Sequence, residues 1–195
     1  MKHTILSGSS RKNSTSLQVS RAIERVLIEL GERDVEVVDF EDYDIPFFNE
    51  DLDTNNLSAF QSRLVNAMRS ADSIIFITPE YNWFPSAEVI HLVHRMSGPA
   101  FKDLWDNKVF SFVGVSTGRG GRMPAVQLGY VVGKIINVFS FDSVTNPKGF
   151  EVQFAGAVLD QDGHSMGSPE FDKGLIDFTD YHIRLSKRWM AGHKA

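Results

Sequence analysis

A loop rich in hydroxyl groups near the amino terminus carries the residues best suited to hold an anion. The segment at 8–16 reads Gly-Ser-Ser-Arg-Lys-Asn-Ser-Thr-Ser and lies between an apolar run and an amphipathic helix pattern. Helix N-termini present unpaired N–H groups, and hydroxyls and an arginine add charge-assisted hydrogen bonds. The loop therefore fits a phosphate group. An ordinary capped helix explains the same hydroxyls, because Ser and Thr are favoured N-cap residues.

This loop matches neither of the two common nucleotide-binding patterns. The sequence has no G-x-x-x-x-G-K-[ST] segment, and no G-x-G-x-x-G between the first predicted strand and the first predicted helix. The first pattern defines the P-loop, and the second defines the dinucleotide-binding loop. This argues against ATP, GTP and a Rossmann-bound NAD.

Two further segments follow predicted buried strands. The segment at 78–85 reads Thr-Pro-Glu-Tyr-Asn-Trp-Phe-Pro, and its rings and backbone groups suit a planar heterocycle. The segment at 116–122 reads Ser-Thr-Gly-Arg-Gly-Gly-Arg, where missing Cβ atoms let the backbone approach a ligand. A structural turn with core-capping aromatics explains the first equally well, and glycine-rich turns also occur without ligands.

Apolar runs that alternate with helical spacing predict an α/β fold with a five-stranded parallel sheet and helices on both faces. Ligands bind at the carboxyl edge of such sheets, and the three loops meet there if the strand order is 2-1-3-4-5. Strands are expected at 3–6, 35–40, 73–78, 109–115 and 139–144, with a short extended piece at 154–159, and helices at 17–30, 58–69, 87–96, 124–136 and 169–190.

Length and composition indicate one domain over residues 1–195 in a cytoplasmic protein. No apolar run approaches the roughly 18 residues that span a membrane, and no signal-peptide pattern opens the chain. The absence of Cys excludes disulfides, thiolate metal sites, iron–sulfur clusters and cysteine nucleophiles. A net charge of −5 without a basic face argues against nucleic acid and anionic membranes as partners.

Together the three segments resemble the NADPH-dependent FMN reductase family, flavodoxin-like enzymes that include azoreductases, quinone reductases and chromate-reducing flavoproteins. The family patterns are roughly G-S-x-R-x-x-S, T-P-E-Y-N and S-x-G-x-x-G-G. They stand here at 8–14, 78–82 and 116–121, the last one residue shorter than the pattern. The ordered triple, rather than any one motif, carries the resemblance.

The resemblance implies FMN as cofactor, NADPH or NADH as hydride donor, a small-molecule electron acceptor, and a homodimer or homotetramer. The flavin carries the chemistry, so no catalytic acid, base or nucleophile is implied. The implied phosphate contacts are Ser9, Arg11, Ser14 and Ser16. The implied isoalloxazine contacts are Pro79, Glu80, Tyr81 and Asn82, with Trp83 counted beside them, and those at the pyrimidine edge are Ser116, Gly118 and Gly120.

The sequence departs from the family pattern after the second motif. Trp83 replaces a small residue, Pro85 comes about one position early, and the following helix reads Glu-Val-Ile-His-Leu-Val-His-Arg in place of the usual Leu-Lys-Asn-Ala and Asp-Trp elements. Trp83 would stack on substrate, narrow access to the flavin or pack into a partner subunit, and the sequence leaves these open.

Other candidate sites are weaker. Glu88, His91 and His94 share one side of a helix, but no fourth metal ligand accompanies them, so a polar surface or subunit interface is favoured. No G-x-S-x-G elbow supports hydrolysis. The first hypothesis is thus an FMN-dependent NAD(P)H oxidoreductase acting on a quinone, azo compound, free flavin or metal ion. The alternatives are an FMN-binding electron carrier or regulatory flavoprotein, and a flavodoxin-like scaffold without flavin.

Overall fold

The computed structural model describes residues 1–192, and residues 193–195 of the predicted domain lie outside this range. The strands are β1 (Lys2–Ser7), β2 (Asp34–Asp39), β3 (Ser73–Pro79), β4 (Val109–Val115), β5 (Val144–Thr145) and β6 (Phe150–Val152). The helices are α1 (Thr15–Glu29), α2 (Ala59–Ser70), α3 (Ala87–Arg95), α4 (Arg122–Phe139), α5 (Ala155–Val158) and α6 (Pro169–Gly192), with a 3-10 helix η1 (Pro99–Leu104) after α3.

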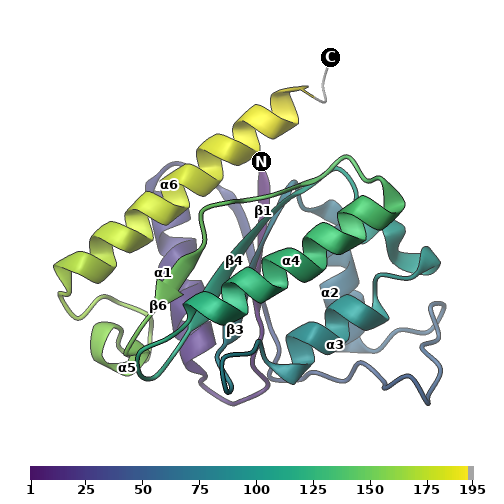
Figure 1. Cartoon of the computed structure of the whole chain (residues 1–195), viewed down its shortest axis with the longest axis horizontal. Coiled ribbons are helices and arrows are strands. Elements are labelled where there is room, and N and C mark those ends of the chain that lie inside the picture. The colour runs from purple at the N-terminus through teal and green to yellow at the C-terminus, as the bar shows by residue number, and fades with distance from the viewer. Residues whose placement is uncertain (193–195) are drawn as a thin grey trace.

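The strands form one parallel sheet in the order β2-β1-β3-β4-β5, and β6 also pairs with β4. This confirms the predicted flavodoxin-like order. Helices α1 and α6 cover one face, and α2, α3 and α4 cover the other (Figure 1). No helix within residues 1–192 is long and apolar enough to cross a membrane.

Strand β3 lies at the centre of the sheet and is buried along its whole length. Successive side chains point to opposite faces of a strand, so a central strand covered on both sides must be apolar throughout. Ile74 and Phe76 accordingly belong to the core under α2, α3 and α4, whereas Ile75 and Ile77 belong to the core under α1 and α6.

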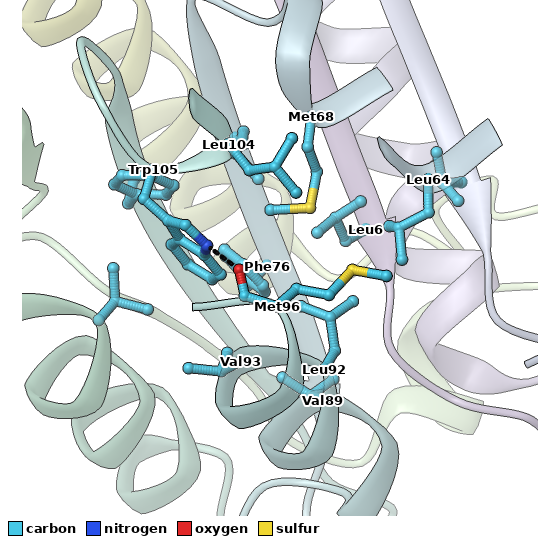
Figure 2. Close-up of a cluster of buried hydrophobic side chains, with 14 of the residues drawn as sticks. Leu6, Leu64, Met68, Phe76, Val89, Leu92, Val93, Met96, Leu104 and Trp105 are labelled. Carbon is cyan, nitrogen blue, oxygen red and sulfur yellow. Dashed lines mark hydrogen bonds between the residues drawn. The ribbon is translucent and has the colours of Figure 1, made fainter. Parts of the chain in front are cut away.

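An aromatic anchor fixes α3 against the sheet (Figure 2). The fully buried Trp105 ring lies nearly parallel to Phe76, with ring centroids 6.2 Å apart. Its indole Nε1–H donates to the carbonyl oxygen of Met96, just past the end of α3, at 2.6 Å. This bond satisfies a buried donor and holds the end of α3 in place.

Two predicted elements are wrong. Residues 139–144 were expected to form the fifth strand, but α4 continues to Phe139, and Ser140 ends it in the left-handed conformation. The edge strand is instead two short pieces, β5 and β6, separated by a segment that contains Pro147 and Gly149. Proline and glycine weaken strand pairing, so the edge is interrupted there.

The second wrong element is the extended piece at 154–159, which is the single helical turn α5. Its sequence, Phe-Ala-Gly-Ala-Val-Leu, is a short run without a polar side chain, and periodicity alone cannot distinguish a buried strand from a helical segment in such a run. Phe154 instead begins the turn with φ at 49°, and its N–H donates to the carbonyl oxygen of Gly118 at 3.0 Å. A tertiary contact thus overrides the local pattern.

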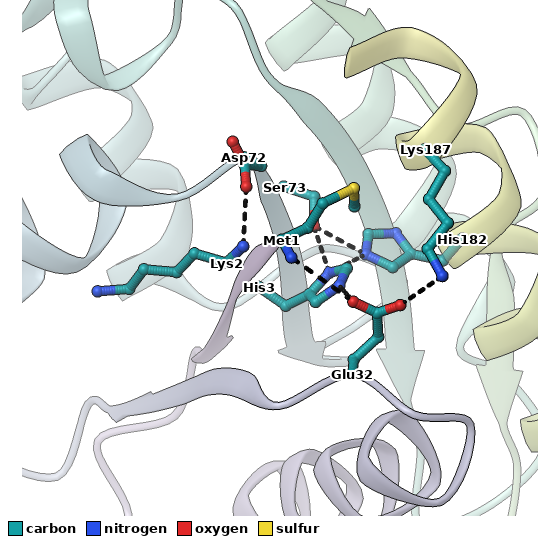
Figure 3. A network of polar contacts seen from close by, with 8 residues as sticks. All are labelled: Met1, Lys2, His3, Glu32, Asp72, Ser73, His182 and Lys187. Carbon is teal, nitrogen blue, oxygen red and sulfur yellow. Dashed lines mark hydrogen bonds and ion pairs between the residues drawn. The ribbon is translucent and has the colours of Figure 1, made fainter. Parts of the chain in front are cut away.

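A buried polar network lies at the amino end of the sheet, under α6 (Figure 3). His3 on β1 and His182 on α6 are both inaccessible to solvent, and their Nδ1 and Nε2 atoms are 3.3 Å apart. Ser73 Oγ lies 2.7 Å from His3 Nδ1 and 3.0 Å from His182 Nε2, and Ser111 Oγ lies 2.7 Å from His182 Nδ1. Burial disfavours the charged imidazolium and lowers the pKa of His182 to about 3.

The buried Glu32 connects this network to Lys187, whose side chain reaches the surface. One carboxylate oxygen lies 3.1 Å from His3 Nε2 and the other 2.8 Å from Lys187 Nζ. Burial alone would raise the pKa of Glu32, but these two contacts outweigh burial and lower it. Desolvation lowers the pKa of His3, although Glu32 opposes that shift. Both histidines therefore favour their neutral forms in the folded chain.

This network predicts that stability falls as pH falls from about 6.5 to 5. In that range the unfolded chain binds a proton at His182 that the folded chain does not, so His182 alone removes up to ~1.4 kcal/mol of unfolding free energy per pH unit. His3, whose pKa is also lowered, acts in the same direction. Glu32 does not contribute in this window. The pKa of Glu32 is lowered from 4.5, so the stability that depends on its charge is lost only below about pH 4.5. Urea unfolding of the parent and of His182→Gln between pH 5 and 7 measures the effect. Equal pH slopes in the two proteins would contradict it.

Candidate functional site

The loops that follow β1, β3 and β4 meet at the carboxyl edge of the sheet, which is the lower edge in Figure 1. The Gly8 N–H donates to the carbonyl oxygen of Ile77 at 2.8 Å, and Ser86 Oγ donates to the Gly8 carbonyl oxygen at 2.6 Å. The Glu80 N–H donates to the carbonyl oxygen of Val115 at 2.8 Å. Hydrogen bonds thus join the first loop to β3 and to the end of the second loop, and the second loop to the end of β4, and the predicted convergence is confirmed.

Close packing explains why the first loop begins with glycine. A Cβ on Gly8 would lie 2.1 Å from Val89 Cγ2 and 2.7 Å from the Ile77 carbonyl oxygen. Any side chain here would push α3 away from β1. The loop is also tied to α3 from its exposed side, where the Ser10 hydroxyl donates to the Glu88 carboxylate.

The four predicted phosphate contacts lie in different environments. Ser14 caps α1, because its hydroxyl accepts from the Leu17 N–H at 3.1 Å. Ser9 is buried and its Oγ accepts weakly from the Arg11 N–H at 3.4 Å. Arg11 is exposed at the rim. Ser16 points inward from the first turn of α1, and its hydroxyl has no hydrogen-bond partner within residues 1–192.

The second loop forms a tight hairpin that the sequence motif alone does not specify. Tyr81 and Phe84 exchange backbone hydrogen bonds of 2.9 and 3.0 Å. The two residues between them, Asn82 and Trp83, have φ angles of 51° and 70°. Positive φ at both central positions is the signature of a type I′ turn. Asn tolerates this conformation, so Asn82 is the residue in the sequence that indicates a turn here.

The hairpin contacts the first loop through a cation and a ring. The Arg11 guanidinium carbon lies 5.0 Å from the centroid of the Tyr81 ring. This separation is within the range of a cation–π interaction, which is modest where the ring is partly exposed. The predicted phosphate residue and the predicted ring-binding residue are therefore direct neighbours. Pro79, by contrast, is buried as the last residue of β3.

Glu80 connects the hairpin to the glycine-rich turn. Its carboxylate accepts a hydrogen bond from the Gly121 N–H, and a Cβ on Gly120 would lie 2.5 Å from Glu80 Oε1. Gly121 has φ at 93°, and its own Cβ would lie 2.6 Å from the carbonyl oxygen of Gly114 on β4. The two glycines are thus needed for conformation and for space. No local pattern in the sequence signals this bond.

The remaining predicted residues of the glycine-rich turn leave room for a ligand. A Cβ placed on Gly118 would meet no atom within 4 Å. Ser116 Oγ accepts from the Gly118 N–H at 3.3 Å, which orders the start of the turn. Arg119 is exposed beside it, and Arg122 Nε donates to the Glu151 carboxylate at 3.0 Å.

The candidate metal ligands on α3 make separate contacts. Glu88 accepts from Ser10, whereas His91 Nδ1 lies 2.8 Å from the Tyr43 hydroxyl and its ring stacks on Phe47 with centroids 4.7 Å apart. His94 is exposed. Over residues 1–192, no group of three or more His, Asp or Glu side chains is placed to hold a metal ion.

Solved flavoprotein structures share this architecture. FerB, an NAD(P)H:acceptor oxidoreductase from Paracoccus denitrificans, superposes with a TM-score of 0.76 at 20% identity, over 96% of this chain and 97% of FerB. An NADH:FMN oxidoreductase superposes with a TM-score of 0.63 at 17% identity, over 94% of this chain and 89% of that chain. At these identities the likeness shows the fold.

Sequence comparison identifies the family. A quinone reductase from Pseudomonas putida is 30% identical over 117 residues, which are 60% of this chain and 61% of that protein. An NADPH:quinone oxidoreductase from Arabidopsis thaliana is 32% identical over 124 residues, which are 60% of this chain and 58% of that protein. The chain thus aligns with about three fifths of the length of these relatives. The model of the NADPH-dependent FMN reductase family matches residues 1–147, which include all three loops, and the chain therefore belongs to this family.

Proposed function

We propose that the whole chain acts as one FMN-binding domain that takes hydride from NADPH or NADH and passes electrons to a small-molecule acceptor. The convergence of the three loops at one sheet edge carries this proposal. The family supports the cofactor, and the similarity to two quinone reductases favours a quinone over an azo compound, free flavin or metal ion. We also propose a cytoplasmic location, where NADPH and NADH are supplied.

The first loop would hold the FMN phosphate. The first N–H groups of α1 have no acceptor within the helix and carry its positive partial charge. Arg11 adds a full charge at the rim, and Ser9 and Ser14 line the loop behind it. The cation–π contact with Tyr81 orients the Arg11 side chain across the loop before any ligand binds.

The hairpin and the glycine-rich turn would hold the ring system. Hydride transfer from the nicotinamide and electron transfer to the acceptor are the chemistry that FMN supplies when bound. Tyr81 and Asn82 offer an aromatic face and an amide, and the open space at Gly118 admits the edge of a planar group. The hydrogen bond from the Gly121 N–H to Glu80 would fix the position of the glycine-rich turn relative to the hairpin.

Absorption spectroscopy of the FMN-loaded and desalted protein tests the proposal. We expect retained flavin that bleaches promptly when NADPH or NADH is added without oxygen. Flavin that stays oxidised would support the electron-carrier alternative, and no retained flavin would support the scaffold alternative. Either result would overturn the reductase proposal.

The phosphate site is tested by Arg11→Ala, with Lys12→Ala as the matched control. Loss of a charged hydrogen bond of about 1.5–3 kcal/mol should raise the dissociation constant of FMN roughly 10- to 150-fold. Lys12 lies in the same loop, but its side chain is 85% exposed and its amino group lies 3.9 Å from Glu41, so its removal should change the constant less than threefold. Equal effects would show a nonspecific charge contribution.

Glu80 is tested by comparing Glu80→Ala with Glu80→Gln. The glutamine oxygen can still accept from the Gly121 N–H, whereas alanine leaves the turn without this bond. A loss of roughly 1–2 kcal/mol predicts FMN binding about 5- to 30-fold weaker in the alanine variant and within about threefold of the parent in the glutamine variant. Isothermal titration with FMN measures both, and indistinguishable variants would rule out this role.

The family resemblance also implies self-association, and we propose a homodimer or a homotetramer. Light scattering of the FMN-loaded protein across a tenfold range of concentration measures the mass directly. A mass of one chain throughout that range would contradict the proposal.

A further inference from the structure

Trp83 combines a strained backbone with an unusually exposed side chain. It occupies the second central position of the Tyr81–Phe84 hairpin, with φ at 70°. Its side chain is 70% exposed. Among the described residues, the indole stacks on no aromatic ring and its Nε1–H donates no hydrogen bond. Most of the ring surface is therefore open to solvent.

The backbone conformation at this position favours glycine. A bulky residue at positive φ brings Cβ close to the following carbonyl oxygen, and Asn-Gly is the preferred pair at the centre of a type I′ turn. Here Asn82 is followed by tryptophan, and two backbone hydrogen bonds hold the strained turn closed. Strain of this kind persists where the surrounding structure enforces it and often marks ligand-binding positions.

The hairpin places Trp83 beside the proposed ring-binding site. On one side Tyr81 contacts Arg11 of the first loop, and on the other Glu80 binds Gly121 of the glycine-rich turn. The tip of the hairpin therefore lies between the two loops. Phe154 also has a positive φ and a partly exposed ring. Its conformation, however, starts helix α5 and lets its N–H donate to the Gly118 carbonyl oxygen, so the fold explains it.

We propose that the Trp83 indole forms one face of the acceptor subsite and determines specificity for planar aromatic acceptors, fused-ring quinones above all. This inference rests on the proposed FMN-dependent reductase function. An exposed indole offers a large, flat, electron-rich surface, and offset stacking is favourable for an electron-poor quinone ring. The side chain has only two side-chain torsions to restrict on binding, so little entropy is lost.

A comparison of two variants with one control tests the proposal. Trp83→Gly removes the ring and relieves the backbone strain, whereas Trp83→Phe keeps an aromatic ring in the same conformation. Tyr130→Ala removes an aromatic side chain that is 77% exposed on α4, outside the three loops. Menadione serves as the planar acceptor and ferricyanide as an acceptor that does not stack.

We expect Trp83→Gly to raise the KM for menadione about 5- to 10-fold more than the KM for ferricyanide, both measured at FMN concentrations that saturate each protein. Trp83→Phe should recover most of the loss, and Tyr130→Ala should match the parent. Relief of strain should raise the Tm of Trp83→Gly by about 2–4 °C, which separates this effect from misfolding.

Fluorescence gives a second readout that needs no turnover. Menadione titrated into the oxidised FMN-loaded parent should quench Trp83 emission, and Trp83→Phe should lose this component because only Trp105 and Trp189 remain.

A lower menadione KM in Trp83→Gly would show that the ring blocks access, and an unchanged KM would show no role; either overturns the proposal. A parent that binds FMN but ignores NADPH and NADH would instead refute the reductase function, whatever Trp83 does.

Discussion

The parallel pairing of β1, β3 and β4 is the constraint on which the rest of the structure depends. Because the three strands run in the same direction and are paired in register, the loops that follow them must leave the sheet at one edge. Strand β3 is buried on both faces, so a one-residue shift of its pairing would exchange its two apolar surfaces. The core therefore fixes where the site residues meet, although none of the core side chains belongs to the site.

Close backbone contacts transmit this order from the sheet to the loops. Gly8 contacts Ile77 and Val89, and Gly121 contacts Gly114, at distances that leave no room for a Cβ. Hydrogen bonds from Glu80 and Ser86 add specific links between loops that are far apart in sequence. The candidate site is thus assembled mainly by backbone groups, so its position depends little on the side chains of the helix after the second loop, which departs from the family pattern.

The sequence predicted the central sheet well because strands β3 and β4 are continuous apolar runs. The helices expected at 58–69 and 87–96 begin at Ala59 and Ala87, where Ser58 and Ser86 are the N-cap residues. The prediction failed at the sheet edge, at 139–144 and 154–159. Partly exposed edge segments have weak periodicity, and their conformation depends on tertiary contacts such as the bond from Phe154 to Gly118.

The same limit applied to the site. The motifs located the three loops, because each follows a strand with a recognisable composition. They did not specify the bond from Glu80 to Gly121 or the contact between Arg11 and Tyr81, since each joins residues that only the folded sheet brings together. The inward orientation of Ser16 was also hidden, because helical periodicity across a first turn is too short to assign a face.

Polar side chains are buried at the amino end of the sheet and exposed at its carboxyl end. The residues that stabilise the fold are therefore distinct from those of the candidate site. At the amino end, His3 and His182 are fully buried and lie within hydrogen-bonding distance of Ser73 and Ser111, so the network is sensitive to acid but has no access to a substrate. At the carboxyl end, exposed side chains project from loops that backbone contacts hold together, and Trp83 adds local strain with φ at 70° in a two-residue turn. Because the strain at Trp83 lies in a hairpin outside the two cores, the site can carry an unfavourable residue while the buried network and the cores maintain the fold.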